Sequence, residues 1–289
     1  MNVLRRIKYH YMNNKIARDI ELQQDIKNNL RKDFQYVIDT FCHDNYKKEF
    51  SNKIFICWFQ GLENAPVLVR KCVESIKRAM PGKEIIVLTD ENYQEYTNFP
   101  NYIIEKYEKG IIPKVHFSDL LRINLLINHG GLWVDSTILC TADSEPEYIT
   151  KMPLFVYKEI SLNNSDIMPI KSSSWLINSC KNHPILIGTQ KILFEYWKNK
   201  KELTNYFLFH LAFSISCDEY ENEFNKIPTY NNVSPHILQF ELEQPYCEER
   251  FFQIKKMSDF HKLNRRIKVE NEVFTNYDYV IGEFKNGKN

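Results

Sequence analysis

The sequence lacks the features that mark a membrane-spanning or secreted chain. None of its apolar runs approaches the roughly 20 residues that a transmembrane helix needs. The first residues are charged and hold no apolar core of a secretory signal, so we expect a cytoplasmic protein. The seven cysteines include no Cys-x-x-Cys pair, which favours reduced thiols over a disulfide framework or a zinc site.

An excess of charge of one sign is also missing. The 38 Lys and Arg residues against 37 Asp and Glu residues leave a net charge of +1. Because nucleic-acid-binding proteins present a basic surface, we expect no nucleic acid as a partner. Residues 1–18 differ, since they hold basic and apolar side chains and no acidic one. Such a helix suits an anionic membrane surface or, alternatively, a solvated or dimer-forming role.

What the chain does have is an alternation of strand and helix patterns. The sequence predicts strands at 53–59, 84–88, 102–104, 132–134 and 153–156, and helices at 67–80, 118–129 and 185–199. This alternation favours an α/β fold with a mostly parallel central sheet and flanking helices. Residues 1–50 are expected to form a helical, basic segment, and residues 51–289 a single larger domain.

Polar side chains follow three of the predicted strands. Trp58, Gln60 and Gly61 come after the first strand, Asp90 after the second, and Asp135 after the strand at 132–134. In parallel sheets, ligands collect beyond the carboxyl ends of the strands. We therefore expect these three segments to build one site.

The helix before Asp135 adds a charged pair. Ser118 is the expected N-cap, which would place Asp119 in the first turn, where a negative charge suits the helix dipole. Asp119 and Arg122 are three residues apart and so share a helix face. An ordinary surface ion pair is the alternative interpretation of these two. Gly130-Gly131 is a strong stop signal for the helix.

The segment SDLLRINLLINHGGLWVDST resembles the core of the capsular-polysaccharide-synthesis glycosyltransferases. These enzymes are relatives of the mannosyltransferase-like enzymes with a glycosyltransferase-A (GT-A) fold and, more distantly, of the large clostridial glucosylating toxins. Their matching pattern is S-D-x-x-R followed by G-G-x-[WY]-x-D. Weaker matches in the same order are IFICWFQG, IIVLTD, WLINSCKNHP, YFLFH and HKL, so the resemblance covers about residues 50–265.

The resemblance implies a GT-A-like domain with a nucleotide-sugar half at about 51–145 and an acceptor half at about 146–289. It also implies a retaining transferase that moves galactose or glucose from a UDP-sugar to a lipid-linked repeat unit of a bacterial capsule or surface polysaccharide, at the inner face of the cell membrane. Two alternatives stay open. One is a non-catalytic sugar-nucleotide-binding or scaffold protein of capsule assembly, and the other is a protein-modifying glycosyltransferase.

The resemblance assigns roles residue by residue. The expected catalytic residues are Asp119, Arg122 and Asp135. Contacts with the donor are expected from Trp58, which would stack on uracil, and from Gln60, Gly61, Asp90, Gly131, Thr137, Ser174 and Lys262. Contacts with the acceptor are expected from Tyr206 and His210. For Trp58 and His210, an ordinary place in the core is the alternative.

A divalent metal, Mn²⁺ or Mg²⁺, is the expected cofactor. Most relatives hold it with an Asp-x-Asp motif, whereas this chain has Asp135-Ser136-Thr137. Both ions prefer hard oxygen ligands, and the resemblance adds a late histidine. The expected ligands are therefore Asp135, Thr137 and His261. The alternative is that Lys262 or Arg122 neutralises the donor diphosphate without a metal.

Overall fold

The computed structural model describes residues 3–42, 46–160, 168–266 and 273–282, with side chains from residue 15 onward. Its centre is a five-stranded sheet with the strand order β2-β1-β3-β6-β5. The strands are β1 (Lys53–Cys57), β2 (Glu84–Leu88), β3 (Gly131–Val134), β5 (Leu154–Lys158) and β6 (Ser172–Ser179). A second, two-stranded sheet pairs β4 (Ile138–Cys140) with β7 (Phe260–Lys262).

The central sheet is mixed. β1 pairs in parallel with β2 and β3, whereas β6 is antiparallel to both of its neighbours, β3 and β5. β2, β1, β3 and β5 therefore run in one direction, and β6 alone opposes them. The predicted α/β class is confirmed, and four of the five strands share one direction, although two of the four strand pairs are antiparallel.

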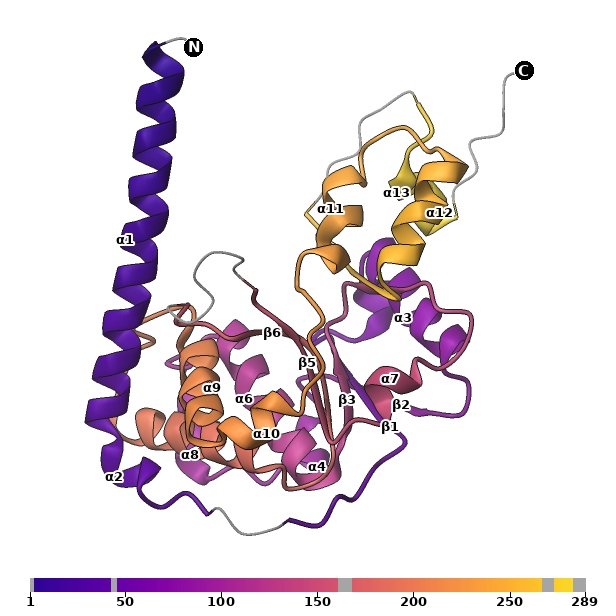
Figure 1. Ribbon diagram of the computed structural model, residues 1–289. Coiled ribbons are helices and arrows are strands. Elements are labelled where there is room, and N and C mark those ends of the chain that lie inside the picture. Colours follow the sequence, from indigo (N-terminus) through magenta and orange to yellow (C-terminus); the bar gives the residue numbers. More distant parts are fainter. Residues whose placement is uncertain (1–2, 43–45, 161–167, 267–272, 283–289) are drawn as a thin grey trace.

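Helices cover both faces of this sheet (Figure 1). The helices before β3 are α1 (Val3–Asp33), α2 (Gln35–Ile38), η1 (Leu62–Asn64), α3 (Val67–Ala79), α4 (Tyr93–Tyr96), α5 (Asn101–Glu108) and α6 (Lys114–His129). The later ones are α7 (Glu147–Thr150), α8 (Pro184–Asn199), α9 (Leu208–Glu219), α10 (Glu221–Asn225), η3 (Ser234–His236), α11 (Ile237–Glu241), α12 (Glu248–Met257) and α13 (Asn276–Ile281). None of the described helices is both long and apolar enough to cross a bilayer.

The core has two layers because side chains alternate between the two faces of each strand. Phe55 and Trp133 point into the larger layer, which α6, α8 and α9 fill. Ile54 and Ile56 point into the other, against Val73, Ile76 and Ala79 of α3. The sheet is thus sandwiched between helices, and only its edges and strand ends are left to form a site.

Helix α6 begins earlier than predicted. It follows Pro113, which sits at the N-cap, so Ser118 and Asp119 lie in the second turn and Ser118 is not the cap. Proline is favoured at a helix start because its fixed φ suits the first turn and it has no N–H to satisfy. The predicted stop is confirmed, since Gly130 ends the helix at φ +65° and donates its N–H to the Leu126 carbonyl.

The predicted short strand at 102–104 is wrong. These residues lie in α5, after Pro100, with Ile103 fully buried. A run of three apolar residues fits a helix and a strand equally well, and here the preceding proline opens a helix.

The two ends of the chain pack on opposite parts of this unit. Leu30 and Phe34, near the end of α1, are buried in the larger core layer, and Lys27 forms an ion pair with Asp218 of α9 at 2.8 Å. The predicted division near residue 50 stays a prediction. Helices α11, α12 and α13 form a C-terminal lobe that rests on α3 through a third apolar cluster, which includes Leu68 and Phe251.

Candidate active site

A cleft of about 690 Å³ lies at the carboxyl ends of β1 and β3. Its volume is within the roughly 300–1,000 Å³ of ordinary small-molecule sites. The sequence-predicted residues that line it are Trp58, Gln60, Arg122, Asp135, Thr137, Tyr206 and Lys262. The cleft therefore gathers side chains from positions more than 200 residues apart in the sequence.

Backbone hydrogen bonds hold the strand ends in register around the cleft. The Trp58 N–H donates to the Leu88 carbonyl at 2.9 Å, and the Asp135 N–H donates to the Trp175 carbonyl at 2.8 Å. The pairing of β1 with both β2 and β3 then fixes the distance between the segments. The meeting of the segments after β1 and β3 thus follows from their parallel pairing, whereas the segment after β2, with Asp90, does not line the cleft.

Asp135 is surrounded by donors. Its Oδ1 accepts from Trp133 Nε1 at 3.0 Å and pairs with Arg122 Nη2 at 3.5 Å, and its Oδ2 accepts from Lys262 Nζ at 3.0 Å. Burial raises the pKa of Asp135, but the charges of Lys262 and Arg122 outweigh it and leave the pKa below its usual value. The carboxylate is therefore ionised and poorly suited to accept a proton.

Arg122 is fixed from several sides. Its Nη1 donates to the Ser174 carbonyl at 2.9 Å and pairs with Asp119 Oδ1 at 3.1 Å. Its guanidinium lies 5.1 Å from the centre of the Trp133 ring. A planar guanidinium clamped in this way presents its remaining N–H groups in a fixed direction. Arg122 is thus pre-positioned at the cleft wall.

Asp119 does not line the cleft. Its side chain is 10% exposed, and its second oxygen lies 3.4 Å from Nδ1 of the buried His116. Both oxygens therefore face protein groups. This geometry suits Asp119 to hold Arg122 in place, and the direct contact of Asp119 with a sugar stays a prediction.

The pairing of β4 with β7 brings Lys262 beside Asp135. Lys262 lies opposite Ile138, and its Nζ also donates to Thr137 Oγ1 at 2.9 Å. Neighbouring side chains of a strand point to opposite faces, so His261 turns the other way. Its Nε2 lies 3.0 Å from Thr141 Oγ1.

His261 is therefore not brought to the cleft, and the structure does not support it as a metal ligand. Its side chain is fully buried, and burial lowers its pKa to about 4. Within the described residues, no cluster of three His, Cys, Asp or Glu side chains is placed to hold a metal ion. The predicted Mn²⁺ or Mg²⁺ ligands thus reduce to Asp135, whose oxygens are already bonded, and the Thr137 hydroxyl. This set does not fit a divalent ion.

Trp58 gives the cleft an aromatic wall. Its indole lies at the cleft wall, and the Arg265 guanidinium sits 5.2 Å from the ring centre. An indole face with a cation above it is a favourable stacking platform for a flat base. Gln60 lines the same wall. Gly61 does not line the cleft; its φ of +79° allows the turn into η1.

Four further predicted residues lie outside the cleft lining. Asp90 is engaged by the Tyr107 hydroxyl and Lys114 Nζ, each at 2.6 Å. Ser174 is buried and contributes its carbonyl to Arg122. His210 is half-buried among Phe207 and Phe209, and burial lowers its pKa to about 4. Tyr206, by contrast, lines the cleft and is 66% exposed.

Gly131, the fourth, is at the wrong end of its strand. It opens β3, whereas the cleft lies past the other end at Asp135. Its backbone has φ +99°, and a Cβ there would come within 2.3 Å of the Lys53 carbonyl oxygen. The glycine is needed for the close approach of β3 to β1, and it does not line the cleft.

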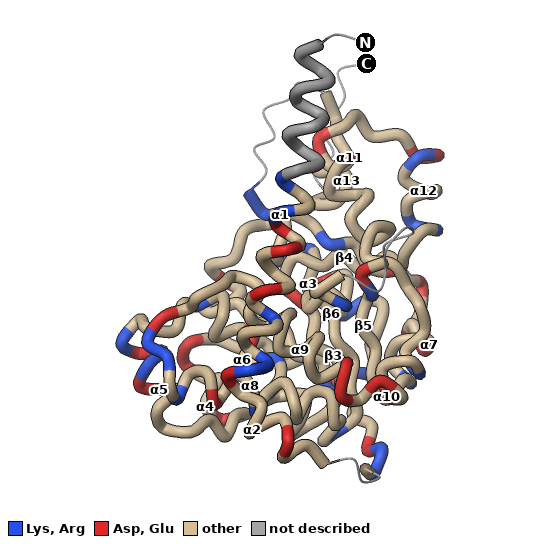
Figure 2. Tube along the Cα trace, turned by 60° about the vertical axis from the view of Figure 1, so that its left-hand side comes forward, with Lys and Arg blue, Asp and Glu red and all other residues tan. Residues whose placement is uncertain are grey.

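Several cleft residues were missed by the sequence analysis. They are Lys114, Ser118, Gln239, Arg265 and Arg266. The sequence predicts Ser118 as a cap, and Gln239 comes from α11, whose contact with the cleft no local pattern indicates. Among the described lining residues, Lys114, Arg122, Lys262, Arg265 and Arg266 are basic and Asp135 alone is acidic. This local excess suits an anion, although both signs are interspersed along the chain as a whole (Figure 2).

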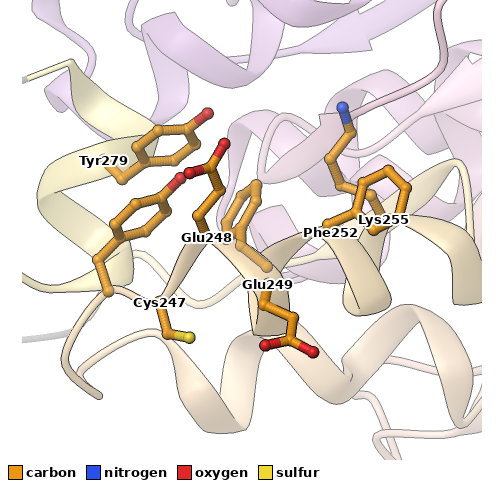
Figure 3. Close-up of a pocket in the computed structure, with 8 residues that line it drawn as sticks. Cys247, Glu248, Glu249, Phe252, Lys255 and Tyr279 are labelled. Carbon is orange, nitrogen blue, oxygen red and sulfur yellow. The ribbon is translucent and has the colours of Figure 1, made fainter.

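A second hollow, of about 590 Å³, lies on the C-terminal lobe (Figure 3). Tyr246 and Tyr279 stack there with ring centres 4.2 Å apart. Glu248 and Glu249 share it with a single basic residue, Lys255. Since none of the predicted residues is present and carboxylates outnumber the cation, this hollow is a poor candidate for a phosphorylated ligand.

Comparison with known proteins agrees with the motif. A family model described as "Capsular polysaccharide synthesis protein" matches residues 6–280. Among solved structures, one named PaToxG Glycosyltransferase matches with 11% identity and a TM-score of 0.43, covering 83% of this chain and 87% of its own. Among curated proteins, no sequence matches. Because the family model spans nearly all of the sequence, including every residue that lines the cleft, this chain belongs to the capsular polysaccharide synthesis protein family.

Proposed function

We propose that the protein is a glycosyltransferase that transfers a hexose, galactose or glucose, from a UDP-sugar to a lipid-linked acceptor in capsule synthesis. The observation that carries the proposal is the meeting of Trp58, Arg122, Asp135 and Lys262 in one cleft at the strand ends. A UDP-sugar presents a flat base, a diphosphate and a polar ring, and the cleft offers an aromatic face, a basic wall and a buried ion-pair network to match them.

The donor would lie along the cleft with its base at Trp58 and its sugar at Arg122 and Asp135. The base stacks on Trp58, with Arg265 above the ring or displaced by the base. The diphosphate then lies among Lys114, Lys262 and Arg266, whose ammonium and guanidinium groups bind phosphate oxygens. The sugar reaches Arg122 and Asp135, since guanidinium donors and carboxylate acceptors both bind hydroxyl groups.

The charges of the cleft favour retention of the anomeric configuration. An inverting transferase needs a general base, and the described lining residues include Asp135 as the only carboxylate and no histidine. Three donors hold it and its pKa is lowered, so it is a weak base. The departing phosphate would then accept the proton of the acceptor hydroxyl on the same face, while Lys262 and Arg122 stabilise the charge that develops on it.

The acceptor would approach past Tyr206. This side chain is exposed at the cleft and offers an aromatic face and a hydroxyl group, which suits a sugar ring. A lipid-linked acceptor implies work at the inner face of the membrane, with residues 1–18 as the predicted contact. Most of the side chains of that segment lie outside the described ones, so this contact stays a prediction.

The release of UDP tests the proposal. The purified protein is incubated with UDP-galactose and UDP-glucose, with and without a lipid-linked acceptor, and UDP is measured. We expect turnover that Asp135→Asn lowers at least a hundredfold while the circular dichroism spectrum is unchanged, because the network around Arg122 and Lys262 loses its only anion in the cleft. Turnover at the normal rate in the variant, or none with any donor in the wild type, would contradict the proposal and favour a scaffold.

A further inference from the structure

In the cleft, a lysine side chain lies where a metal ion would be expected beside Asp135 and Thr137. Asp135 and Thr137 occupy the two positions at which an Asp-x-Asp motif would supply carboxylates. Lys262 Nζ lies between their side chains, 3.0 Å from Asp135 Oδ2 and 2.9 Å from Thr137 Oγ1. A positive charge is therefore already part of the protein at this place.

The remaining donor capacity of Lys262 points to a ligand. An ammonium group has three N–H donors and no acceptor. Two are engaged by Asp135 and Thr137, and Lys262 also lines the cleft. With no third partner for Lys262 among the described side chains, one donor is left for an anionic group in the cleft, and a phosphate oxygen is the acceptor that fits it best.

The charge balance points the same way. Five basic side chains and one carboxylate line the described part of the cleft, and the carboxylate already faces Arg122 and Lys262. A divalent cation placed at Asp135 would meet two positive groups and only one anionic ligand from the protein. Hard ions of this kind prefer several oxygen ligands, so the electrostatics disfavour a metal and favour a diphosphate.

We propose that the Lys262 ammonium, held by Asp135 and Thr137, takes the place of a divalent metal and binds the donor diphosphate without one. This inference rests on the proposed function, because it concerns the same cleft and the same nucleotide. It predicts that UDP binds the protein with equal affinity in the presence and absence of metal ions. It also predicts that the affinity depends on the charge of residue 262.

The test measures UDP binding by isothermal titration calorimetry with the full-length protein, in excess EDTA and in excess MnCl₂. We expect the dissociation constants to agree within twofold. Lys262→Met should weaken binding roughly ten- to hundredfold, the effect of losing a hydrogen bond to a charged group. Manganese should not restore it. Lys262→Arg, which keeps the charge, should recover most of the affinity.

Lys71→Met is the matched control, because Lys71 is an exposed lysine of α3 that pairs with Glu74 outside the cleft. It should bind UDP like the wild type, and the thermal unfolding of each variant shows whether it is folded. UDP binding that requires MnCl₂, or full affinity in folded Lys262→Met, would overturn the inference and leave the proposed function standing. No UDP binding under either condition would instead refute the proposed function, and the inference with it.

Discussion

Replacing Asp119 by Asn tests whether this residue acts through Arg122. The two side chains are 10% and 6% exposed, and their charged atoms are 3.1 Å apart. Removing one partner of a buried ion pair costs about 3–5 kcal/mol, since the other charge stays buried. Arg122 retains Asp135 at 3.5 Å and the Ser174 carbonyl at 2.9 Å. We therefore expect a smaller loss of about 2–3 kcal/mol in the free energy of unfolding.

A urea titration measures this loss directly, and a thermal scan should show a decrease of roughly 4–10 °C in Tm. Glu74→Gln is the matched control, because it removes the same charge from an exposed pair with Lys71. Its expected effect is below about 1 kcal/mol.

Activity separates a positioning role from direct contact. If Asp119 acts through Arg122, Asp119→Asn lowers kcat for UDP release at least tenfold, and it causes no further loss in a protein that already carries Arg122→Met. Independent, additive losses would mean that Asp119 itself touches the substrate. An Asp119→Asn protein as stable as Glu74→Gln would refute the buried-pair argument.

Two further predictions concern stability. Gly131→Ala should lower the free energy of unfolding by about 1–3 kcal/mol in a urea titration, because the backbone has φ +99° and the new Cβ would meet the Lys53 carbonyl. Gly82→Ala is the control, since a Cβ there meets open space, and it should change the free energy of unfolding little. Stability should also fall as the pH drops from about 6.5 toward 4. Burial lowers the pKa of His210 and His261 in the folded protein to about 4, so in this pH range these histidines take up protons only in the unfolded chain. Urea titrations at several pH values should show a flatter slope for His261→Asn, and an unchanged slope would contradict the assignment.

The elements that position the site could be predicted where local signals are strong. The strands leading to Trp58 and Asp135 are short apolar runs that end in polar residues, and Gly130 marks the end of α6. Parallel pairing of β1 with β3 then brings these ends together. The start of α6 was misplaced because Ser118 satisfies a capping pattern, while the proline five residues earlier sets the true start.

The partners of the site residues could not be predicted, because they depend on contacts that are distant in the sequence. The sequence places His261 and Lys262 side by side and does not say which one faces Asp135. The pairing of Ile138 with Lys262 decides it. Burial of Asp119 behind Arg122 likewise depends on how α6 packs against the sheet, and a three-residue spacing is compatible with either an exposed or a buried pair.

The β4–β7 ribbon makes the charge network around Asp135 depend on the C-terminal part of the chain. Lys262 joins Asp135 across 127 positions of chain. A chain that ended before β7 would keep Arg122 beside the Asp135 carboxylate but would lack the second cation that holds it.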